Sequence, residues 1–161
     1  QRKPYEINKL LKSMLIELRE VSLENFDQVV KLKLPKGAKR NLASNVYSIA
    51  TSKYFPIYQP RAIYCDSLVV GFLMYTSLSN FQKPNNYLIF RFMVDYQHQR
   101  KGIGRLALLK AIEEIRQIEN AEKVIVNYDP RNEIAKCFYK KLGFIEVGLD
   151  ENNEMVAEMA L

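Results

Sequence analysis

Residues 99–104 read QRKGIG, and they stand between an apolar run, Tyr87–Val94, and a segment with helical periodicity that begins at Ile103. This order predicts a strand, a glycine-containing loop and a helix. A helix N-terminus presents backbone N–H groups without intrahelical partners at the positive end of the helix dipole. Glycine lets an anion approach those groups closely. Three cations flank the glycines: Arg100, Lys101 and Arg105. The loop is therefore expected to bind a pyrophosphate.

The chain after this loop alternates helices with strands. Gly102–Glu119 is predicted to be an amphipathic helix. Its apolar positions follow helical spacing: Leu108, Ala111, Ile112 and Ile115. The continuous apolar centre of Lys123–Tyr128 is typical of a strand that is covered on both faces. The remaining elements are a helix over Asn132–Lys141 that ends at Gly143, and two closing strands, Phe144–Val147 and Glu154–Ala160.

The chain before the loop predicts further strands and two short helices. The expected elements are a strand over Met14–Glu20, a short helix capped by Ser22, a helix at about Asn41–Lys53, a hairpin of Ala62–Cys65 and Leu68–Tyr75 that turns at Asp66–Ser67, and a long strand over Tyr87–Asp95. Loops are expected between Pro56 and Pro60 and over SNFQKPNN, residues 79–86. Residues 1–13 are interpreted as an extension or an expression remnant, and residues 14–161 as one mixed α/β domain.

Composition limits the classes of partner. The net charge of +6 fits nucleic acid, an acidic membrane surface or an anionic small molecule. The basic cluster Lys31–Arg40 is expected to be solvated surface, whereas the cluster at residues 99–105 also carries glycines. No apolar run approaches the ~18 residues of a membrane span. Two distant cysteines and a single histidine predict neither a disulfide framework nor a metal site, and a reducing cytoplasm fits this pattern.

Two other phosphate motifs compete for the glycine loop. The Walker pattern fails on spacing and lacks its lysine–hydroxyl pair. The dinucleotide fingerprint is formally matched by Gly102, Gly104 and Ala107, and Asp129 lies where a ribose-binding carboxylate would be needed. That fingerprint starts almost directly after its strand, whereas residues 96–101 intervene here. Only one strand–helix–strand unit is present, so a doubly wound nicotinamide domain is disfavoured.

A second motif decides between the readings. Residues 132–144 read NEIAKCFYKKLGF and follow the next strand after a short loop. Together with VDYQHQRKGIGRLAL, residues 94–108, this segment resembles the Gcn5-related N-acetyltransferase superfamily. The acetyl-CoA loop pattern is matched by Gln99, Gly102 and Gly104. The downstream pattern is matched by Asn132, Ala135, Phe138, Tyr139, Gly143 and Phe144. The predicted element order from Met14 onward also suits this fold.

The resemblance implies a mixed, mostly antiparallel sheet with a splayed parallel pair of strands, flanked by helices. It implies that the pantetheine arm of acetyl-CoA lies between Tyr87–Asp95 and Lys123–Tyr128. The backbone of Phe92, Met93 and Val94 would then pair with the pantetheine amides. The pyrophosphate would contact the loop residues Gln99, Arg100, Lys101, Gly102, Ile103 and Gly104, with Arg105 adding charge. Asn132 would donate to the pantetheine arm. The nucleotide side would be lined by Lys136, Phe138 and Lys141.

The implied reaction is direct attack of an amine on the thioester. Tyr139 would donate a proton to the leaving thiolate, and the backbone N–H of Val94 would polarise the thioester carbonyl. An alkylamine is neutral in only ~1 molecule in 10³ at pH 7. Many relatives supply a glutamate base on the long central strand, but YLIFRFMVD, residues 87–95, offers Arg91 and no carboxylate before Asp95. The sequence leaves several bases open: a water chain, Tyr128, an acid of the first half, Glu146 and Asp150.

The stretch RFMVDYQHQRKGIG, residues 91–104, is similar to that of bacterial spermine/spermidine acetyltransferases, which implies a polyamine acceptor. Acetylation of another small amine, or of a protein N-terminus or lysine, stays open as an alternative. Two functions of other classes also stay open. A non-catalytic acetyl-CoA sensor would keep the loop and Asn132 but need no base. A nucleic-acid-binding module would use Lys31–Arg40, yet no basic motif with interleaved aromatic residues is present. The expected partners are a small amine and, as in many relatives, a second copy of the chain, with no nucleic acid, membrane or metal.

Overall fold

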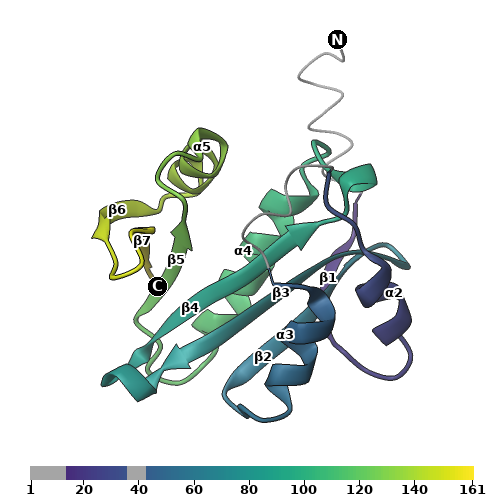
Figure 1. Cartoon of the computed structure of the whole chain (residues 1–161), viewed down its shortest axis with the longest axis horizontal. Helices are drawn as coiled ribbons and strands as arrows, with labels where there is room; N and C mark the ends of the chain where they lie inside the picture. The colour runs from purple at the N-terminus through teal and green to yellow at the C-terminus, as the bar shows by residue number, and fades with distance from the viewer. Residues whose placement is uncertain (1–13, 36–42) are drawn as a thin grey trace.

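A computed structural model describes residues 14–35 and 43–161 (Figure 1). Its strands form one seven-stranded sheet in the order β1-β2-β3-β4-β5-β7-β6. The strands are β1 (Ile16–Glu20), β2 (Tyr58–Cys65), β3 (Leu68–Leu78), β4 (Lys83–Val94), β5 (Lys123–Tyr128), β6 (Ile145–Leu149) and β7 (Met155–Ala160). Neighbouring strands are antiparallel except β4 and β5, which are parallel. The mixed, mostly antiparallel sheet expected from the sequence is confirmed.

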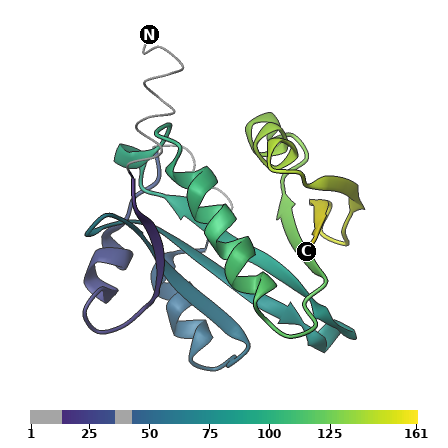
Figure 2. The ribbon, with the colours of Figure 1, turned by 180° about the vertical axis from the view of Figure 1, so that it is seen from behind.

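Helices cover both faces of this sheet, as Figures 1 and 2 show from opposite sides. The helices are α2 (Phe26–Lys31), α3 (Asn45–Ser52), α4 (Ile103–Arg116) and α5 (Glu133–Lys141). The predicted apolar face of α4 is buried against one side of the sheet, together with Leu73 of β3. Phe72 and Met74 of the same strand point the other way and pack with α2 and α3. Side chains of a strand alternate between faces, so β3 contributes to two separate cores.

The parallel pair β4–β5 is short and then diverges. Its register runs from Asn86 opposite Lys123 to Ile89 opposite Val126. Beyond that point β4 continues to Val94 along β3, while β5 continues to Tyr128 along β7. We call the diverging ends, residues 90–94 of β4 and 127–128 of β5, the splay (Figure 1). The splayed pair implied by the family resemblance is therefore present.

Several predicted boundaries were wrong. Helix α2 begins at Phe26 after an Asn25 cap, because the segment near Ser22 forms a turn in which Ser22 N–H donates to Asn25 Oδ1. The polar segment expected to be a loop belongs partly to β4, which starts at Lys83. Strand β2 starts at Tyr58 and includes Pro60. Proline is tolerated there because β1 pairs with β2 only as far as Arg61.

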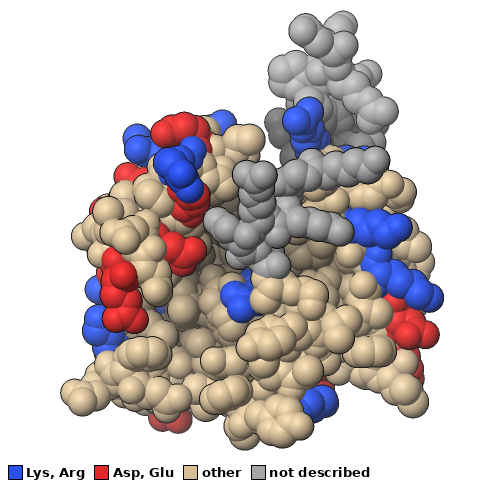
Figure 3. Space-filling model, in the orientation of Figure 1, with Lys and Arg blue, Asp and Glu red and all other residues tan. Residues whose placement is uncertain are grey.

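Other predictions hold or fall outside the described residues. Asp66, with φ of 56°, forms the expected hairpin turn with Ser67. The proposed extension over residues 1–13, and Asn41 and Leu42 at the start of the second predicted helix, lie outside the described ranges. Within those ranges, none of the helices is long and apolar enough to cross a membrane. Acidic and basic side chains both gather over the part of the molecule that holds α5, β6 and β7 (Figure 3).

Candidate functional site

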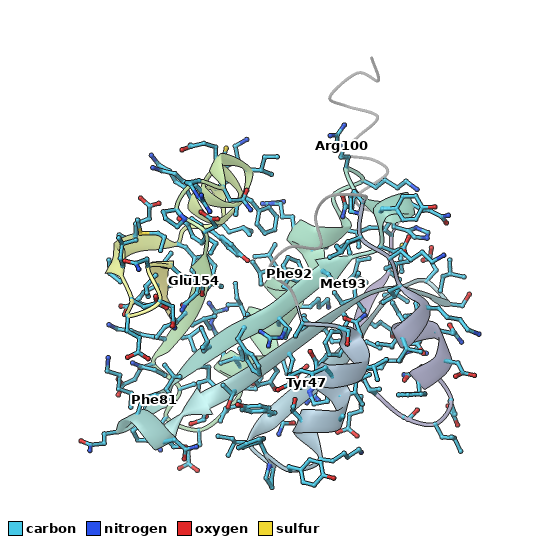
Figure 4. The ribbon with its side chains drawn as sticks, viewed as in Figure 1. Tyr47, Phe81, Phe92, Met93, Arg100 and Glu154 are labelled. Atoms are coloured by element: carbon cyan, nitrogen blue, oxygen red, sulfur yellow. The ribbon has the colours of Figure 1, made fainter. Side chains whose placement is uncertain are left out.

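The glycine loop connects the end of β4 to the start of α4. A short 3-10 helix, Tyr96–His98, follows β4, and the chain then turns through Arg100, whose φ is 60°. Gly102 precedes the first helical residue with φ of 83°, a left-handed conformation that glycine adopts without steric cost. The side chains of Arg100, Lys101 and Arg105 are exposed. The sequence therefore places a cationic turn at the N-terminus of the longest helix among the described residues, and Figure 4 labels Arg100 there.

The first turn of α4 offers free backbone donors. Intrahelical bonding starts with Leu106 N–H, which donates to Gly102 O at 3.2 Å. The N–H groups before it, those of Ile103, Gly104 and Arg105, have no carbonyl of the preceding turn to bond. A Cβ built on Gly104 would meet only Phe92, Val94 and Phe138, at 3.7–4.0 Å. Protein packing does not require glycine at this position, and the close approach of an anion would.

The end of β4 presents peptide groups toward the splay. Asp95 N–H donates to Val70 O of β3 at 2.8 Å, whereas Val94 O accepts from Gln99 Nε2 at 2.9 Å. Peptide groups alternate in direction along a strand, so those of Val94 and Phe92 face the splay and that of Met93 faces β3. The expected backbone pairing with a pantetheine arm is thus geometrically open to Phe92 and Val94. The prediction for Met93 is corrected, because its peptide pairs across to Phe72.

A row of aromatic rings links the two sides of the splay. Phe92 of β4 stacks on Phe138 of α5 with ring centroids 6.1 Å apart. Phe138 contacts Tyr139 edge to face at 5.3 Å, and Tyr139 stacks on Tyr128 of β5 at 5.4 Å. Figure 4 labels Phe92 on β4. The motif residues Phe138 and Tyr139 are therefore brought to the same place as the free peptide groups.

Burial controls the acidity of the tyrosines in this row. It raises the pKa of Tyr139 to about 12. The pKa of Tyr128 is also raised, by burial and by its hydrogen bond to Glu146 Oε1 at 2.7 Å. A phenol with a raised pKa is protonated at neutral pH, so both groups are hydrogen-bond donors there and neither is a base.

The remaining predicted ligands on α5 occupy different positions. Asn132 precedes the helix and accepts from Ala135 N–H through Oδ1 at 3.0 Å, which leaves its amide NH₂ as a donor. Lys136 pairs with an acidic side chain of β6. Its Nζ lies 3.9 Å from Glu146 Oε2, on the β6 side. Lys141 is exposed in the last turn. Of the proposed bases, Asp150 accepts three N–H groups, from Asn127, Asn152 and Glu154, and organises the β6–β7 turn.

A cavity of about 310 Å³ lies on the α2–α3 side of β4. Its lining is largely apolar and includes Val30, Leu32, Leu34, Phe72, Phe92 and Met93. Two cations, Arg91 and Lys33, also line it. The sequence signal for Arg91 was a single cation inside an apolar strand, and its role as a lining residue was not predicted. Phe92 borders both this cavity and the splay, so the two spaces are adjacent.

Asp95 connects the segment that lines the cavity to the glycine loop through hydrogen bonds. This buried carboxylate accepts from Lys33 N–H at 2.8 Å and from Gln97 N–H at 3.0 Å. Tyr96 N–H in turn donates to Lys33 O at 2.9 Å. The segment after α2 is thereby fixed to the residues that open the glycine loop. Sequence reasoning noted Asp95 only as the end of the strand.

The sequence and the fold both match known acetyltransferases. Residues 38–144 match the Acetyltransferase (GNAT) family. The chain is similar to the spermine/spermidine N(1)-acetyltransferase of Bacillus subtilis (strain 168), with 24% identity over 147 residues, which cover 89% of this chain and 97% of that protein.

Solved structures share the fold. PaiA N-acetyltransferase from Thermoplasma acidophilum in complex with coenzyme A has a TM-score of 0.68 at 19% identity, covering 92% of this chain and 100% of that one. The ribosomal-protein-S18-alanine N-acetyltransferase from Escherichia coli has a TM-score of 0.67 at 17% identity, covering 91% and 93%.

The matched region and the fold define an N-acetyltransferase that uses acetyl-CoA as co-substrate. The chain belongs to the acetyltransferase (GNAT) family. The residues described above fit such a ligand, because the free donors at the helix N-terminus lie close to the Phe92 and Val94 peptide groups that face the splay, and a Cβ on Gly104 would only make ordinary contacts with Phe92, Val94 and Phe138. Within residues 14–35 and 43–161, no three His, Cys, Asp or Glu side chains gather as a metal site requires.

Proposed function

We propose that the protein transfers the acetyl group of acetyl-CoA directly to a primary amine in the splay between β4 and β5. The observation that carries the proposal is the convergence at Gly104, where a Cβ would lie within 3.7–4.0 Å of Phe92, Val94 and Phe138. A strand end, a helix N-terminus and the motif helix α5 thus meet at one point. This arrangement offers hydrogen-bond donors at two sites, suited to the two polar parts of one elongated ligand.

Each predicted ligand except Met93 has a place in this proposal. The pyrophosphate accepts from the backbone of the loop and of the first turn of α4, including Ile103 and Gly104. Arg100, Lys101 and Arg105 add charge at the mouth of the site, and the Gln99 side chain fixes the loop to Val94 O. The pantetheine amides pair with Phe92 and Val94, and the Asn132 amide donates to the same arm. Lys136 and Lys141 are retained only as long-range charges.

The chemistry follows from the acidity of the groups. Bound acetyl-CoA supplies the acetyl group as a thioester, whose thiol leaves. Val94 N–H, which faces the splay, is placed to donate to the thioester carbonyl and to stabilise negative charge on that oxygen. Tyr139 OH is the proposed donor to the leaving sulfur. Its pKa of about 12 keeps it protonated at every pH at which the protein would be assayed.

The amine is expected to react in its neutral form. At pH 7 an alkylamine with a pKa near ~10.4 is neutral in roughly 1 molecule in 10³. Tyr128 is protonated at neutral pH and is not a base, and Asp150 holds the β6–β7 turn through three N–H donors. The value of kcat/KM should therefore rise about tenfold per pH unit between pH 7 and 9. A plateau in that range would instead indicate a protein base such as Glu146.

The acceptor suggested by the relatives is a polyamine. The support is the likeness to the Bacillus subtilis protein at 24% identity and the similarity of residues 91–104 to such enzymes. We take spermidine, spermine and putrescine as the first acceptors for assay. Two features from the sequence stay predictions beside this one: a reducing cytoplasm, which suits free Cys65 and Cys137, and a homodimer.

The test is amine-dependent release of coenzyme A thiol from acetyl-CoA, measured with a thiol reagent. Arg105→Ala should raise the KM for acetyl-CoA about tenfold, because a phosphate contact at a helix N-terminus is lost. Lys110→Ala removes an exposed cation from the same helix, away from the loop, and should leave that KM unchanged. Absence of thiol release with every amine, while acetyl-CoA still binds, would refute transferase activity and favour a sensor.

A further inference from the structure

The cavity beside the splay has an unusual charge for an amine acceptor site. Its cations, Arg91 and Lys33, face a lining that contains no carboxylate among the described residues. An acceptor amine is itself cationic before it reacts, so a site for a polycation would be expected to contain carboxylates.

Arg91 is held in place without being neutralised. Its Nε donates to the buried Ser48 Oγ at 3.3 Å, and its Nη1 donates to Phe90 O at 2.8 Å. Its guanidinium lies 5.1 Å from the centre of the Phe90 ring. The ion pairs of the described residues do not include Arg91. A fixed guanidinium with free donors is suited to bind a carboxylate or phosphate.

The acids that a polyamine would need lie elsewhere. Asp95, the buried carboxylate at the end of β4, is already bonded to Lys33 N–H and Gln97 N–H. Asp150 organises the β6–β7 turn. Glu154 lies with β5 and β7, away from the α2–α3 side of β4 (Figure 4). Acidic groups in Figure 3 gather, interspersed with Lys and Arg, over α5, β6 and β7, while uncharged residues dominate the centre of that face.

We propose that the acceptor is a small aliphatic amine that also carries an anionic group, which Arg91 binds with support from Lys33. This inference rests on the proposed function, since the cavity is taken as the acceptor site of the transferase. The apolar lining accommodates the methylene chain, and a volume of about 310 Å³ suits a small molecule. Because Phe92 borders both spaces, an acceptor anchored at Arg91 directs its amine past Phe92 into the splay.

The test compares two probes that share a five-methylene chain and one primary amine. These are 6-aminohexanoate, which ends in a carboxylate, and pentane-1,5-diamine, which ends in a second amine. Binding of each to the full chain saturated with coenzyme A is measured by calorimetry, so the result does not depend on turnover. The carboxylate probe should bind at least about tenfold more tightly. The preference should fall as salt is raised from ~0.05 to ~0.5 M, because the Debye length shortens.

Variants then assign the preference to its residues. Arg91→Gln should abolish it and Arg91→Lys should retain part of it, because a single charge remains without the planar fork. Lys33→Gln changes an exposed side chain and should reduce the preference severalfold. Lys31→Gln is the matched control, because Lys31 is an exposed cation of α2 outside the cavity lining. Equal or tighter binding of the diamine, or a preference that survives Arg91→Gln, would overturn the inference.

Kinetics separate this inference from the proposed function. Acetylation of 6-aminohexanoate with a higher kcat/KM than pentane-1,5-diamine and spermidine supports both. Efficient acetylation of spermidine without any effect of Arg91→Gln keeps the transferase and overturns the anionic acceptor. Arg91-dependent binding of 6-aminohexanoate with no acetylation of any amine overturns the transferase but leaves an anion site in the cavity.

Discussion

Replacement of Tyr139 by phenylalanine removes only the hydroxyl that is proposed to assist the leaving thiolate. The size of the effect depends on whether the phenol gives up its proton or only donates a hydrogen bond. The pKa of Tyr139 is raised to about 12, and the thiol is taken as cysteine-like with a pKa of ~8.5. Full proton transfer is then uphill by roughly 3.5 in pKa, or ~5 kcal/mol. Hydrogen-bond donation is the favoured role.

A hydrogen bond to a charged group contributes about 1.5–3 kcal/mol. Tyr139→Phe should therefore lower kcat by roughly 10- to 150-fold, using ~1.4 kcal/mol per factor of ten. The KM for acetyl-CoA should change little, because the bond forms only as charge develops on sulfur. The ring still packs on Tyr128, Phe138 and Phe144. The free energy of unfolding should accordingly stay within about 0.5 kcal/mol of wild type.

The assay is thiol release under saturating acetyl-CoA from pH 7 to 10, beside urea unfolding of both proteins. An unchanged kcat for Tyr139→Phe would remove Tyr139 from the reaction. A loss above ~10⁴-fold would indicate complete proton transfer. The wild-type kcat could also fall with rising pH, with a midpoint below pH 10, while the kcat of Tyr139→Phe does not. This result would show that the pKa of the Tyr139 phenol is far below the value that its burial gives it. The first result would contradict a role for Tyr139 in the reaction, the second its role as a hydrogen-bond donor alone, and the third its raised pKa.

Three further predictions follow from the same geometry. Gly104→Ala should raise Tm by about 2–4 °C, since alanine is the better helix former and its Cβ meets only ordinary contacts. The same variant should bind acetyl-CoA about tenfold more weakly, because the added Cβ takes up space above the helix N-terminus. Equal binding of acetyl-CoA to both proteins in a calorimetric titration would argue against a ligand there. Asn132→Asp should keep the hydrogen bond from Ala135 N–H that caps the helix but lose the N–H donor to acetyl-CoA. Asn132→Ala should lose both the cap and the donor, and its free energy of unfolding in urea should fall by about 1 kcal/mol. A Kd for acetyl-CoA unchanged in both variants would exclude Asn132 as a ligand. The folded protein raises the phenol pKa values of Tyr75 and Tyr139, so it disfavours their phenolate forms. Their contribution to the free energy of unfolding is therefore complete below pH ~10 and is lost as the pH rises beyond it. Absorbance titration should find that these phenols ionise only when the protein unfolds, and ionisation in the native protein at lower pH would contradict their burial.

Local patterns predicted those parts of the fold that are set by local chemistry. The apolar spacing of α4 and the uninterrupted apolar centre of β5 were sufficient, because each element buries a continuous surface. The start of β4 was missed, because its polar residues from Lys83 onward pair with Leu78 and Lys123 rather than burying side chains. Pro60 in β2 was read as a loop residue for a similar reason, since its tolerance depends on where the neighbouring strand β1 ends.

The features of the candidate site that depend on short segments were likewise predicted, and those that depend on distant residues were not. The glycine loop and the motif of α5 carry their chemistry in short contiguous segments, so they were recognisable. Arg91 was visible only as a strand cation, because its meaning depends on Ser48 and on a cavity built from α2, α3 and β4. The direction of the Met93 peptide follows from the register with β3, and the brace formed by Asp95 joins residues 62 positions apart. Strand register and the packing of distant residues cannot be predicted from a short sequence pattern.

The central claim is that acetyl-CoA lies in the splay with its pyrophosphate at the N-terminus of α4. A crystal structure of the protein with coenzyme A tests it most directly. We expect pyrophosphate oxygens within hydrogen-bond distance of the backbone N–H groups of Ile103–Arg105, and pantetheine amides paired with Phe92 and Val94. A coenzyme bound elsewhere, or one whose pyrophosphate avoids that helix terminus, would contradict it.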